Sequence, residues 1–446
     1  MQRSRRITPD APRSATTRRQ GAFLTALALS AMGLAACGSG SSNSATPTLN
    51  YYINPDSSGA TQQAAAACTK ESGGKYKIAI SVLPATADGQ REQIVRRLAA
   101  HDSSIDIVLV DPPYTPELAN AGWLLSLEPH KSEVLNGVLK SPIASATWQG
   151  KLIAAPYSAN TQLMWYRKSV AKRASVDPTS PDFTWSKMID AAVKTHTYVE
   201  EQGNKYEGYM VWVNAMVLGA GGSILQHNDK GRDATVSLNS AAGRKAAEII
   251  HQLATSKAAD PALSTATEDI GRVAFQGPHG GFMLNWPYVY AAAKADVKGG
   301  ALKASVLDDI GFARYPRVDV NIPSKPPVGG ANLAISKYSA HPVQAYEAIK
   351  CLISPAKEKI RILGLGDPVA NGTLYDDAEI RKAFPMASLM RESINAAGPR
   401  PVTPFYGDVS AAIQRDFHPP SSVNPNSSPK KAASLISDVL HDKRLL

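Results

Sequence analysis

The sequence predicts an α/β protein in which short buried strands alternate with amphipathic helices. Three segments have the apolar or alternating pattern of strands, and two segments between them have helical periodicity. These segments are 48–53, 76–83 and 105–110 for the strands and 62–70 and 89–101 for the helices. A repeated order of strand and helix indicates a sheet covered by helices. Ligands bind such sheets beyond the carboxyl ends of the strands, where Asn54, Asp56 and Asp111 follow.

The same alternation continues along the rest of the chain. Thr184 is predicted to cap a helix that runs to residue 193, because a threonine side chain can accept a hydrogen bond from the first helical turn. The other expected elements are helices at 211–218 and 343–353, a strand at 282–288 that runs into a loop, and strands at 310–315 and 331–335. A Pro- and Ser-rich surface loop is expected at 419–429.

The first 36 residues have the parts of a secretory signal. Arginines precede an apolar run from Gly21 to Ala36, which is shorter than the roughly 20 apolar residues of a membrane span. The last residues of this run, followed by Cys37, resemble the lipoprotein box of bacteria; the alternative is a signal with a chance Ala-Ala-Cys. We therefore expect residues 1–36 to be removed and Cys37 to carry a lipid anchor. Residues 37–47, which are rich in Gly and Ser, would be a flexible tether.

Length and charge restrict the class of protein. The chain has 446 residues and a net charge of +10, of which six arginines and one aspartate in the signal supply half. The remainder suits two lobes of ordinary domain size. Its basic residues are spread along the sequence, which argues against nucleic-acid binding. No other apolar run is long enough to span a membrane, so we expect an extracytoplasmic protein held at the cell membrane by lipid.

Three cysteines are present, and two remain once Cys37 is assigned to the anchor. Cys68 and Cys351 both fall in predicted helices, and an even number of cysteines in an oxidising location favours a disulfide. The alternative is two buried free thiols. No Cys or His lies at metal-ligand spacing from either, so no metal site and no cofactor are expected.

Several short motifs, arranged in one order, resemble the extracytoplasmic sugar-binding proteins of ABC importers, in the maltose-binding class. The motifs are 155–167, 183–185, 219–223, 285–287, 329–333 and 400–406. Within that family, the strings at 160–163, 165–167 and 400–404 are most similar to the trehalose-binding lipoproteins of actinobacterial importers. The loop at 54–56 differs from the loop of that group.

The resemblance implies a two-lobe fold of the periplasmic-binding-protein type, with hinge strands and a ligand cleft. The amino-terminal lobe would comprise 48–156 and about 316–366, and the carboxy-terminal lobe 157–315 and about 367–446. The hinge would cross near 156–162, 311–317 and 364–372. The implied partners are a sugar and the permease subunits of an ABC importer. The sugar is expected to be an α-linked disaccharide such as trehalose, and the binding protein is expected to be a monomer.

A sugar site needs planar polar groups, because each hydroxyl both donates and accepts, and an aromatic ring for the apolar face of the sugar. Motif position in the resembling family selects six candidates, and the position after a strand adds two. The residues are Gln90, Asp111, Asn160, Glu268, Trp286 and Arg400, with Asn54 and Asp56 as additions.

Five candidates also have a structural interpretation. They are Asp111 as a turn cap, Asn160 as a satisfied amide, Glu268 as a solvated first-turn acid, Trp286 as a core residue and Arg400 as a structural ion-pair partner. As alternatives to sugar capture we consider a lipid-anchored glycosidase with Asp111 and Glu268 as its carboxylates, about 5 to 10 Å apart, and a surface adhesion lipoprotein. No Gly-x-Ser-x-Gly, His-Glu-x-x-His or Walker motif is present, so no catalytic residue is assigned.

Overall fold

The computed structural model describes residues 46–445, which belong to one compact unit. The predicted signal peptide, Cys37 and the predicted tether up to residue 45 lie outside the described residues. Within the described range, no helix has both the length and the apolar character needed to cross a membrane.

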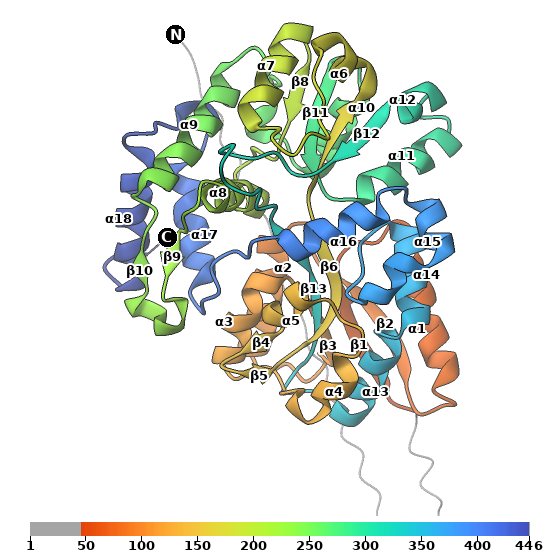
Figure 1. The fold of residues 1–446 in the computed structure, drawn as a ribbon. Coiled ribbons are helices and arrows are strands. Elements are labelled where there is room, and N and C mark those ends of the chain that lie inside the picture. The colour runs from red at the N-terminus through yellow and green to blue at the C-terminus, as the bar shows by residue number, and fades with distance from the viewer. Residues whose placement is uncertain (1–45, 446) are drawn as a thin grey trace, which may run out of the picture. The chain divides into compact units, whose positions relative to one another are not determined.

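The first sheet has five strands in the order β2-β1-β3-β13-β6 (Figure 1). Its strands are β1 (Thr48–Ile53), β2 (Lys77–Val82), β3 (Ile107–Val110), β6 (Ala155–Thr161) and β13 (Val328–Ile335). The predicted strands 48–53, 76–83 and 105–110 pair in parallel, as expected for strands joined by helices. β13 is antiparallel to both β3 and β6, so the sheet is mixed.

The second sheet has four strands in the order β12-β7-β11-β8. Its strands are β7 (Leu163–Arg167), β8 (Tyr198–Glu200), β11 (Gly280–Asn285) and β12 (Ile310–Ala313). Only Gln162 separates β6 from β7, so the chain passes from the first sheet to the second at this point. The strand expected at 282–288 ends at Asn285, because Pro287 immediately precedes a helix that starts at Tyr288.

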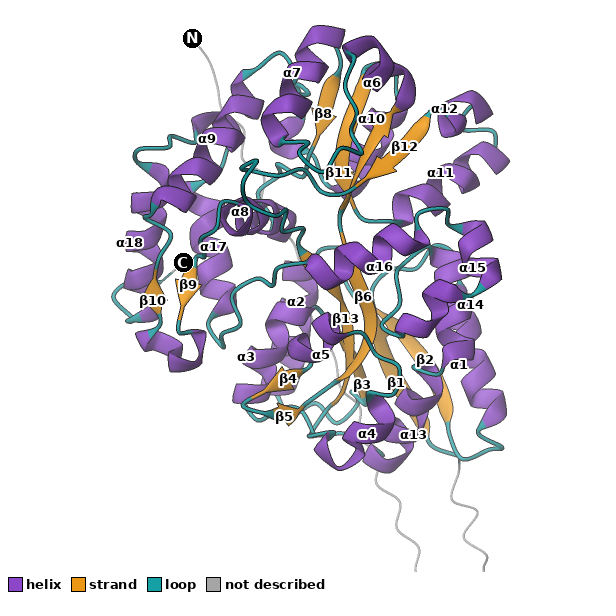
Figure 2. Cartoon of the chain, viewed as in Figure 1, coloured by secondary structure: helices purple, strands orange, loops and turns teal. Residues whose placement is uncertain are grey.

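Helices flank both sheets (Figure 2). The α-helices are α1 (Ala60–Glu71), α2 (Ala87–Ala99), α3 (Thr115–Asn120), α4 (Lys131–Val134), α5 (Lys140–Ser145), α6 (Lys168–Ala174), α7 (Trp185–Thr195), α8 (Glu207–Gly219), α9 (Ala241–Thr255), α10 (Glu268–Gln276), α11 (Tyr288–Lys298), α12 (Ala304–Asp308), α13 (Pro342–Leu352), α14 (Pro355–Leu365), α15 (Ala378–Ala383), α16 (Ala387–Ala396), α17 (Tyr406–Asp416) and α18 (Ser428–Leu440).

Smaller elements complete the described chain. The short strands are β4 (Thr147–Trp148), β5 (Lys151–Leu152), β9 (Leu225–Gln226) and β10 (Thr235–Val236). The 3-10 helices are η1 (Pro112–Tyr114), η2 (Glu128–His130), η3 (Asn228–Asp233), η4 (Leu263–Thr265), η5 (Gly372–Asp376) and η6 (Pro420–Ser422).

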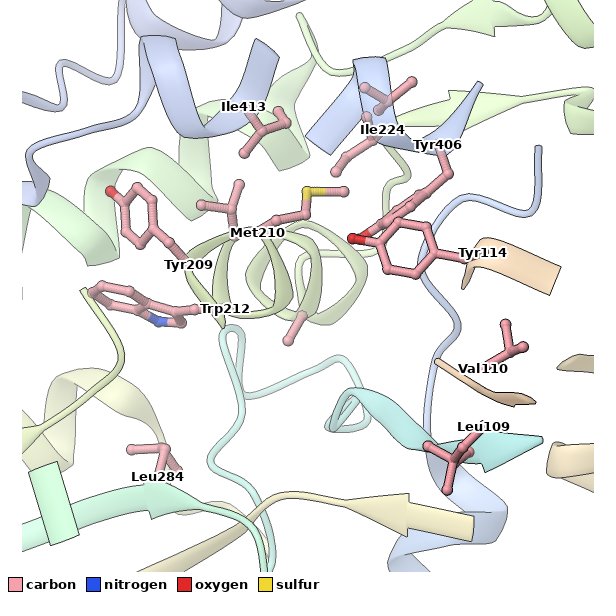
Figure 3. Packing of buried hydrophobic residues seen from close by; sticks show 14 of the residues in the cluster. Leu109, Val110, Tyr114, Tyr209, Met210, Trp212, Ile224, Leu284, Tyr406 and Ile413 are labelled. Carbon is pink, nitrogen blue, oxygen red and sulfur yellow. The ribbon is translucent and has the colours of Figure 1, made fainter. Parts of the chain in front are cut away.

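Helix α7 begins where the sequence predicts, because the Thr184 side chain accepts a hydrogen bond from the Lys187 amide. Helix α8 begins at Glu207, four residues before the predicted start at 211. It is buried nearly all round, as expected for a helix that is apolar on every face. Figure 3 shows its Tyr209, Met210 and Trp212 among packed side chains.

Cys68 on α1 and Cys351 on α13 form a disulfide, with their Cα atoms 5.8 Å apart. The disulfide prediction is confirmed, and the alternative of two free thiols is wrong. The late helices divide in their packing, since α16 lies against β6 and α5 whereas α17 lies against α8 and α18. The lobe boundaries and the three hinge crossings stay predictions.

Candidate functional site

A cavity of about 520 Å³ collects all eight residues that the sequence singled out as ligand-binding candidates. They are Asn54, Asp56, Gln90, Asp111, Asn160, Glu268, Trp286 and Arg400. Asp111 follows β3 and Asn160 is the penultimate residue of β6 in the first sheet, whereas Trp286 follows β11 of the second. Elements attached to both sheets therefore build one cavity.

A larger cavity of about 760 Å³ shares Arg400 with the first. Its other lining residues are mostly proline, alanine, valine and leucine, with Lys140 and a few small polar residues. The smaller cavity has the carboxylates, amides and aromatic rings that a polar ligand needs. We therefore take the smaller cavity as the candidate ligand site.

Arg400 is the centre of the charged network in the cavity wall. Its guanidinium donates from Nη2 to Asp111 Oδ1 at 2.6 Å and from Nη1 to Asp111 Oδ2 at 3.1 Å. Nη1 also donates to Glu207 Oε1 at 2.6 Å. The side chains of Arg400 and Glu207 are 3% and 4% exposed, so this ion pair is almost free of solvent. Two carboxylates thus share one buried cation.

Glu207 was not predicted, although its carboxylate accepts several hydrogen bonds in the cavity wall. Its carboxylate accepts hydrogen bonds from Ser410 Oγ at 2.6 Å and from the hydroxyl of Tyr406, and its backbone amide donates to Asp88 Oδ2 at 2.8 Å. Tyr406 packs edge-on against Tyr114 (Figure 3), and the Tyr114 hydroxyl also donates to Glu207 Oε2 at 3.4 Å. Burial raises the pKa of Glu207 to about 7, against the lowering effect of the Arg400 charge.

These contacts test the structural interpretations that the sequence allowed for Asp111 and Arg400. The Asp111 side chain makes no capping hydrogen bond to η1, so the turn-cap alternative is wrong. Arg400 is a structural ion-pair partner, and it lines the cavity as well. The two roles are compatible, because a guanidinium has five N–H donors.

A second network of charged side chains lies next to β6 and is centred on Asp367. Asp367 accepts hydrogen bonds from Asn160 Nδ2 at 2.7 Å, from Ser158 Oγ at 2.9 Å and from Arg361 Nη2 at 3.2 Å. The Arg361 guanidinium also stacks 3.8 Å from the centroid of the Tyr157 ring. Burial raises the pKa of Asp367, and Arg361 lowers it only in part. The Nε of Arg361 has no hydrogen-bond partner among the described residues.

Asn160 is a satisfied amide as well as a lining residue. Its Oδ1 accepts from the Thr161 amide at 2.9 Å while its Nδ2 donates to Asp367. Gln90 Nε2 donates to the Pro84 carbonyl at 3.0 Å. Each side chain keeps hydrogen-bonding capacity for a ligand, because an amide has two N–H donors and a carbonyl with two lone pairs.

Asn54 and Asp56, the two candidates that follow β1, differ in how many of their polar atoms are free to bind a ligand. Asp56 accepts from the Thr61 amide at 2.7 Å and from the Ser58 hydroxyl at 2.6 Å, which holds the start of α1. Burial raises the pKa of Asp56, but these hydrogen bonds outweigh burial, and the pKa is lowered. The Asn54 side chain is exposed at the cavity edge.

Glu268 and Trp286 face the cavity from the elements of the second sheet. Glu268 is the first residue of α10 and is half-buried, so it is not a fully solvated acid. Burial raises the pKa of Glu268, and the neighbouring Asp269 and Asp111 raise it further. Trp286 is half-buried and belongs to neither hydrophobic core, which argues against the core interpretation. Its ring lies against Gly329, where an added Cβ would come within 2.5 Å.

Sequence reasoning missed Glu207, Arg361 and Asp367. For Glu207 a signal existed: it is followed directly by a stretch in which Asn214 is the one strongly polar residue, and an acid in such a place must be buried with a partner. For Arg361 and Asp367 no local pattern was available. Their roles depend on contacts with β6, which is about 200 residues earlier.

Comparison with known proteins assigns the chain to a family. The family model of the bacterial extracellular solute-binding proteins matches residues 54–359, more than half of the chain. The chain belongs to this family. The predicted fold class, α/β with the two-lobe architecture of periplasmic binding proteins, is confirmed by a solved structure of similar architecture.

That structure is maltose-bound MalE3 of T. maritima, with a TM-score of 0.77 and 21% identity, covering 89% of this chain and 100% of that chain. Two relatives in sequence are a probable ABC transporter-binding protein of Deinococcus radiodurans and the diacetylchitobiose binding protein DasA of Streptomyces coelicolor. The first is 24% identical over 77% of this chain and 80% of its own length. The second is 23% identical over 86% of this chain and 88% of its own length.

Proposed function

We propose that this solute-binding protein captures a sugar outside the cell and delivers it to the permease subunits of an ABC importer. The proposed sugar is an α-linked disaccharide, with trehalose as the leading candidate. The observation that carries the proposal is the cavity itself. It combines a half-buried tryptophan ring with carboxylates, amides and guanidiniums. This is the mixture that a sugar requires, because the ring covers C–H groups while the planar polar groups pair with hydroxyls.

The relatives support the sugar and the transporter. One structural relative holds maltose, one sequence relative is named for diacetylchitobiose, and another is named an ABC transporter-binding protein. Charge-assisted hydrogen bonds contribute about 1.5 to 3 kcal/mol each. Four or five of them, after the cost of association, would give a micromolar complex of about −8 kcal/mol.

Calorimetric titration of the purified protein with a panel of disaccharides and oligosaccharides tests this function. The protein is kept in a detergent without a sugar headgroup, since such a headgroup would compete. We expect trehalose to bind first and maltose second. At a hundredfold excess over Kd, the ligand should add about 2.7 kcal/mol to the free energy of unfolding. Absence of binding by every glycan in the panel contradicts the sugar proposal.

Replacing Trp286 by alanine should weaken sugar binding by about 2 to 4 kcal/mol, or roughly 30- to 1,000-fold in Kd, if the ring is the stacking surface. The melting temperature of the empty protein should change by only a few degrees, because the ring lies outside both cores. Trp148→Ala is the matched control, since Trp148 is also half-buried but does not line the cavity. A Trp286→Ala protein that unfolds when empty yet binds sugar normally would show that Trp286 is a packing residue.

The glycosidase alternative receives no support from the geometry. Both carboxylate oxygens of Asp111 are engaged by the Arg400 guanidinium, which leaves this group poorly placed to act as nucleophile or base. The relatives described above are solute-binding proteins. We therefore propose no catalytic role for the cavity. Release of monosaccharide during incubation with the disaccharide panel would overturn this part of the proposal.

We also propose that Cys37 carries the lipid that holds the protein at the outer face of the cell membrane, and that the protein acts as a monomer. Cys37→Ala should release the protein into the medium or leave its precursor uncleaved, because two acyl chains provide a stable anchor and no helix among residues 46–445 is long and apolar enough to replace it. Cell fractionation with immunodetection measures this. Normal processing and firm membrane retention of the variant would contradict the anchor.

A further inference from the structure

The candidate cavity has a strong excess of acidic groups in a protein whose overall balance is basic. Six carboxylates and two guanidiniums line the cavity, with no lysine or histidine. The carboxylates are those of Asp56, Asp111, Glu207, Glu268, Asp269 and Asp367. The complete chain has a net charge of +10. The acidic lining is therefore opposite in sign to the average of the chain.

Ion pairing does not remove this excess. Arg361 pairs with Asp367, and Arg400 serves both Asp111 and Glu207, so one of the latter two is uncompensated. Asp269 has a partner outside the cavity, Arg272. Asp56 and Glu268 have no cationic partner within 4.0 Å among the described residues. Both oxygens of Asp56 accept hydrogen bonds at the start of α1, whereas Glu268 is half-buried at the cavity wall. Glu268 is thus the acid whose charge is most open to a ligand.

We propose that this cavity selects sugars by charge, accepting neutral ones, favouring those that carry an ammonium group and rejecting those that carry a phosphate or carboxylate, with Glu268 as the determinant. The inference rests on the proposed sugar-binding function and specifies its ligand class. An ammonium group on the sugar would give the half-buried carboxylate of Glu268 a cationic partner. A phosphate in the same place meets uncompensated negative charge beside a half-buried carboxylate, where solvent screens charge less than it does at an exposed surface.

The aromatic rings of the cavity favour the same ligand class. Trp286, Tyr206 and Tyr288 line it, and the face of an aromatic ring attracts a cation and repels an anion. The Tyr288 hydroxyl donates to Asp269 Oδ1 at 2.9 Å, which keeps this ring beside the end of the cavity that Glu268 and Asp269 form. Both the carboxylates and the rings therefore discriminate in one direction.

The test is calorimetric titration at low ionic strength with three forms of one disaccharide: trehalose, 6-amino-6-deoxytrehalose and trehalose 6-phosphate. We expect the amino form to bind about tenfold more tightly than trehalose and the phosphate at least about tenfold more weakly. Added salt should reduce both differences. If the disaccharide identified by the functional screen is not trehalose, the same three forms of that disaccharide are compared.

Glu268→Gln should shrink the preference for the amino form over neutral trehalose to near unity, measured as the ratio of the two Kd values in the same variant. Glu92→Gln is the control, because Glu92 is an exposed acid on α2 outside the cavity, and it should leave the order of affinities unchanged. Asp269→Asn provides a second cavity variant should Glu268→Gln fail to fold.

The outcomes separate the two proposals. Binding of the phosphate as tightly as the neutral sugar, or no gain from the amino group, overturns charge selection and leaves the sugar-binding function intact. A charge preference that Glu268→Gln and Asp269→Asn both leave unchanged overturns the assignment to this end of the cavity. Failure of every glycan, neutral or charged, overturns the proposed function and the inference together.

Discussion

Replacing Arg400 by methionine should lower the free energy of unfolding by about 3 to 5 kcal/mol, the typical cost of removing one partner from a buried ion pair. The structure gives the reason. Asp111 and Glu207 would lose the only cation within ion-pair distance of either among the described residues. Glu207 would have to take up a proton or stay charged in a buried site, since its pKa is about 7 even beside Arg400. Chemical denaturation at pH 8, where that proton is scarce, measures the loss.

Two further variants make the Arg400 experiment specific. Arg314→Met removes an exposed arginine whose ion pair with Glu392 has side-chain exposures of 68% and 57%, and it should cost at most about 1 kcal/mol. Glu207→Gln, added to Arg400→Met, removes one of the two stranded acids and should recover part of the stability. An Arg400→Met protein as stable as the native one would show that the network contributes nothing to folding.

Loss of the Cys68–Cys351 disulfide is the second large effect. The double alanine variant should be less stable by about 2 to 4 kcal/mol. The bridge joins positions 283 residues apart, and a link across so long a loop restricts the unfolded chain strongly. In the folded state it ties α1 to α13, on the side of the first sheet where α14 also packs against α1.

Chemical denaturation with and without a reducing agent measures the contribution of the disulfide. The reducing agent should destabilise the native protein and leave the double alanine variant unchanged, which separates the disulfide from side-chain packing at the two sites. Thiol titration of the unreduced, denatured protein is the direct check. Two reactive thiols beyond Cys37 would contradict the disulfide.

Local patterns in the sequence were sufficient to predict several elements of the fold. The strand at 48–53 has the predicted bounds, and Thr184 caps α7 as expected. Both signals are local: side chains alternate along a strand, and a capping residue acts on the turn that follows it. The start of α8 was predicted four residues too late. A helix that is buried nearly all round has no alternation of polar and apolar faces, so the sequence does not mark its first turn.

The candidate site divides in the same way between local and distant information. Motif resemblance selected six residues and the position after a strand added two, and all eight line one cavity. It did not select Glu207, which enters the site through an ion pair with Arg400, 193 positions later in the chain. It also gave Asn160 no partner, whereas the structure pairs it with Asp367, 207 positions away.

By itself, then, the sequence determined the α/β alternation, the helix cap at Thr184 and the residue types that a sugar site requires, because each is encoded within a few neighbouring positions or in a family motif. Only the tertiary structure decided which charges meet. Asp111 and Arg400 are 289 positions apart, and their pairing depends on how two sheets and a late loop pack together. Burial then fixes the strength of the pair, and burial is a property of the packed chain that the local order of residues does not contain.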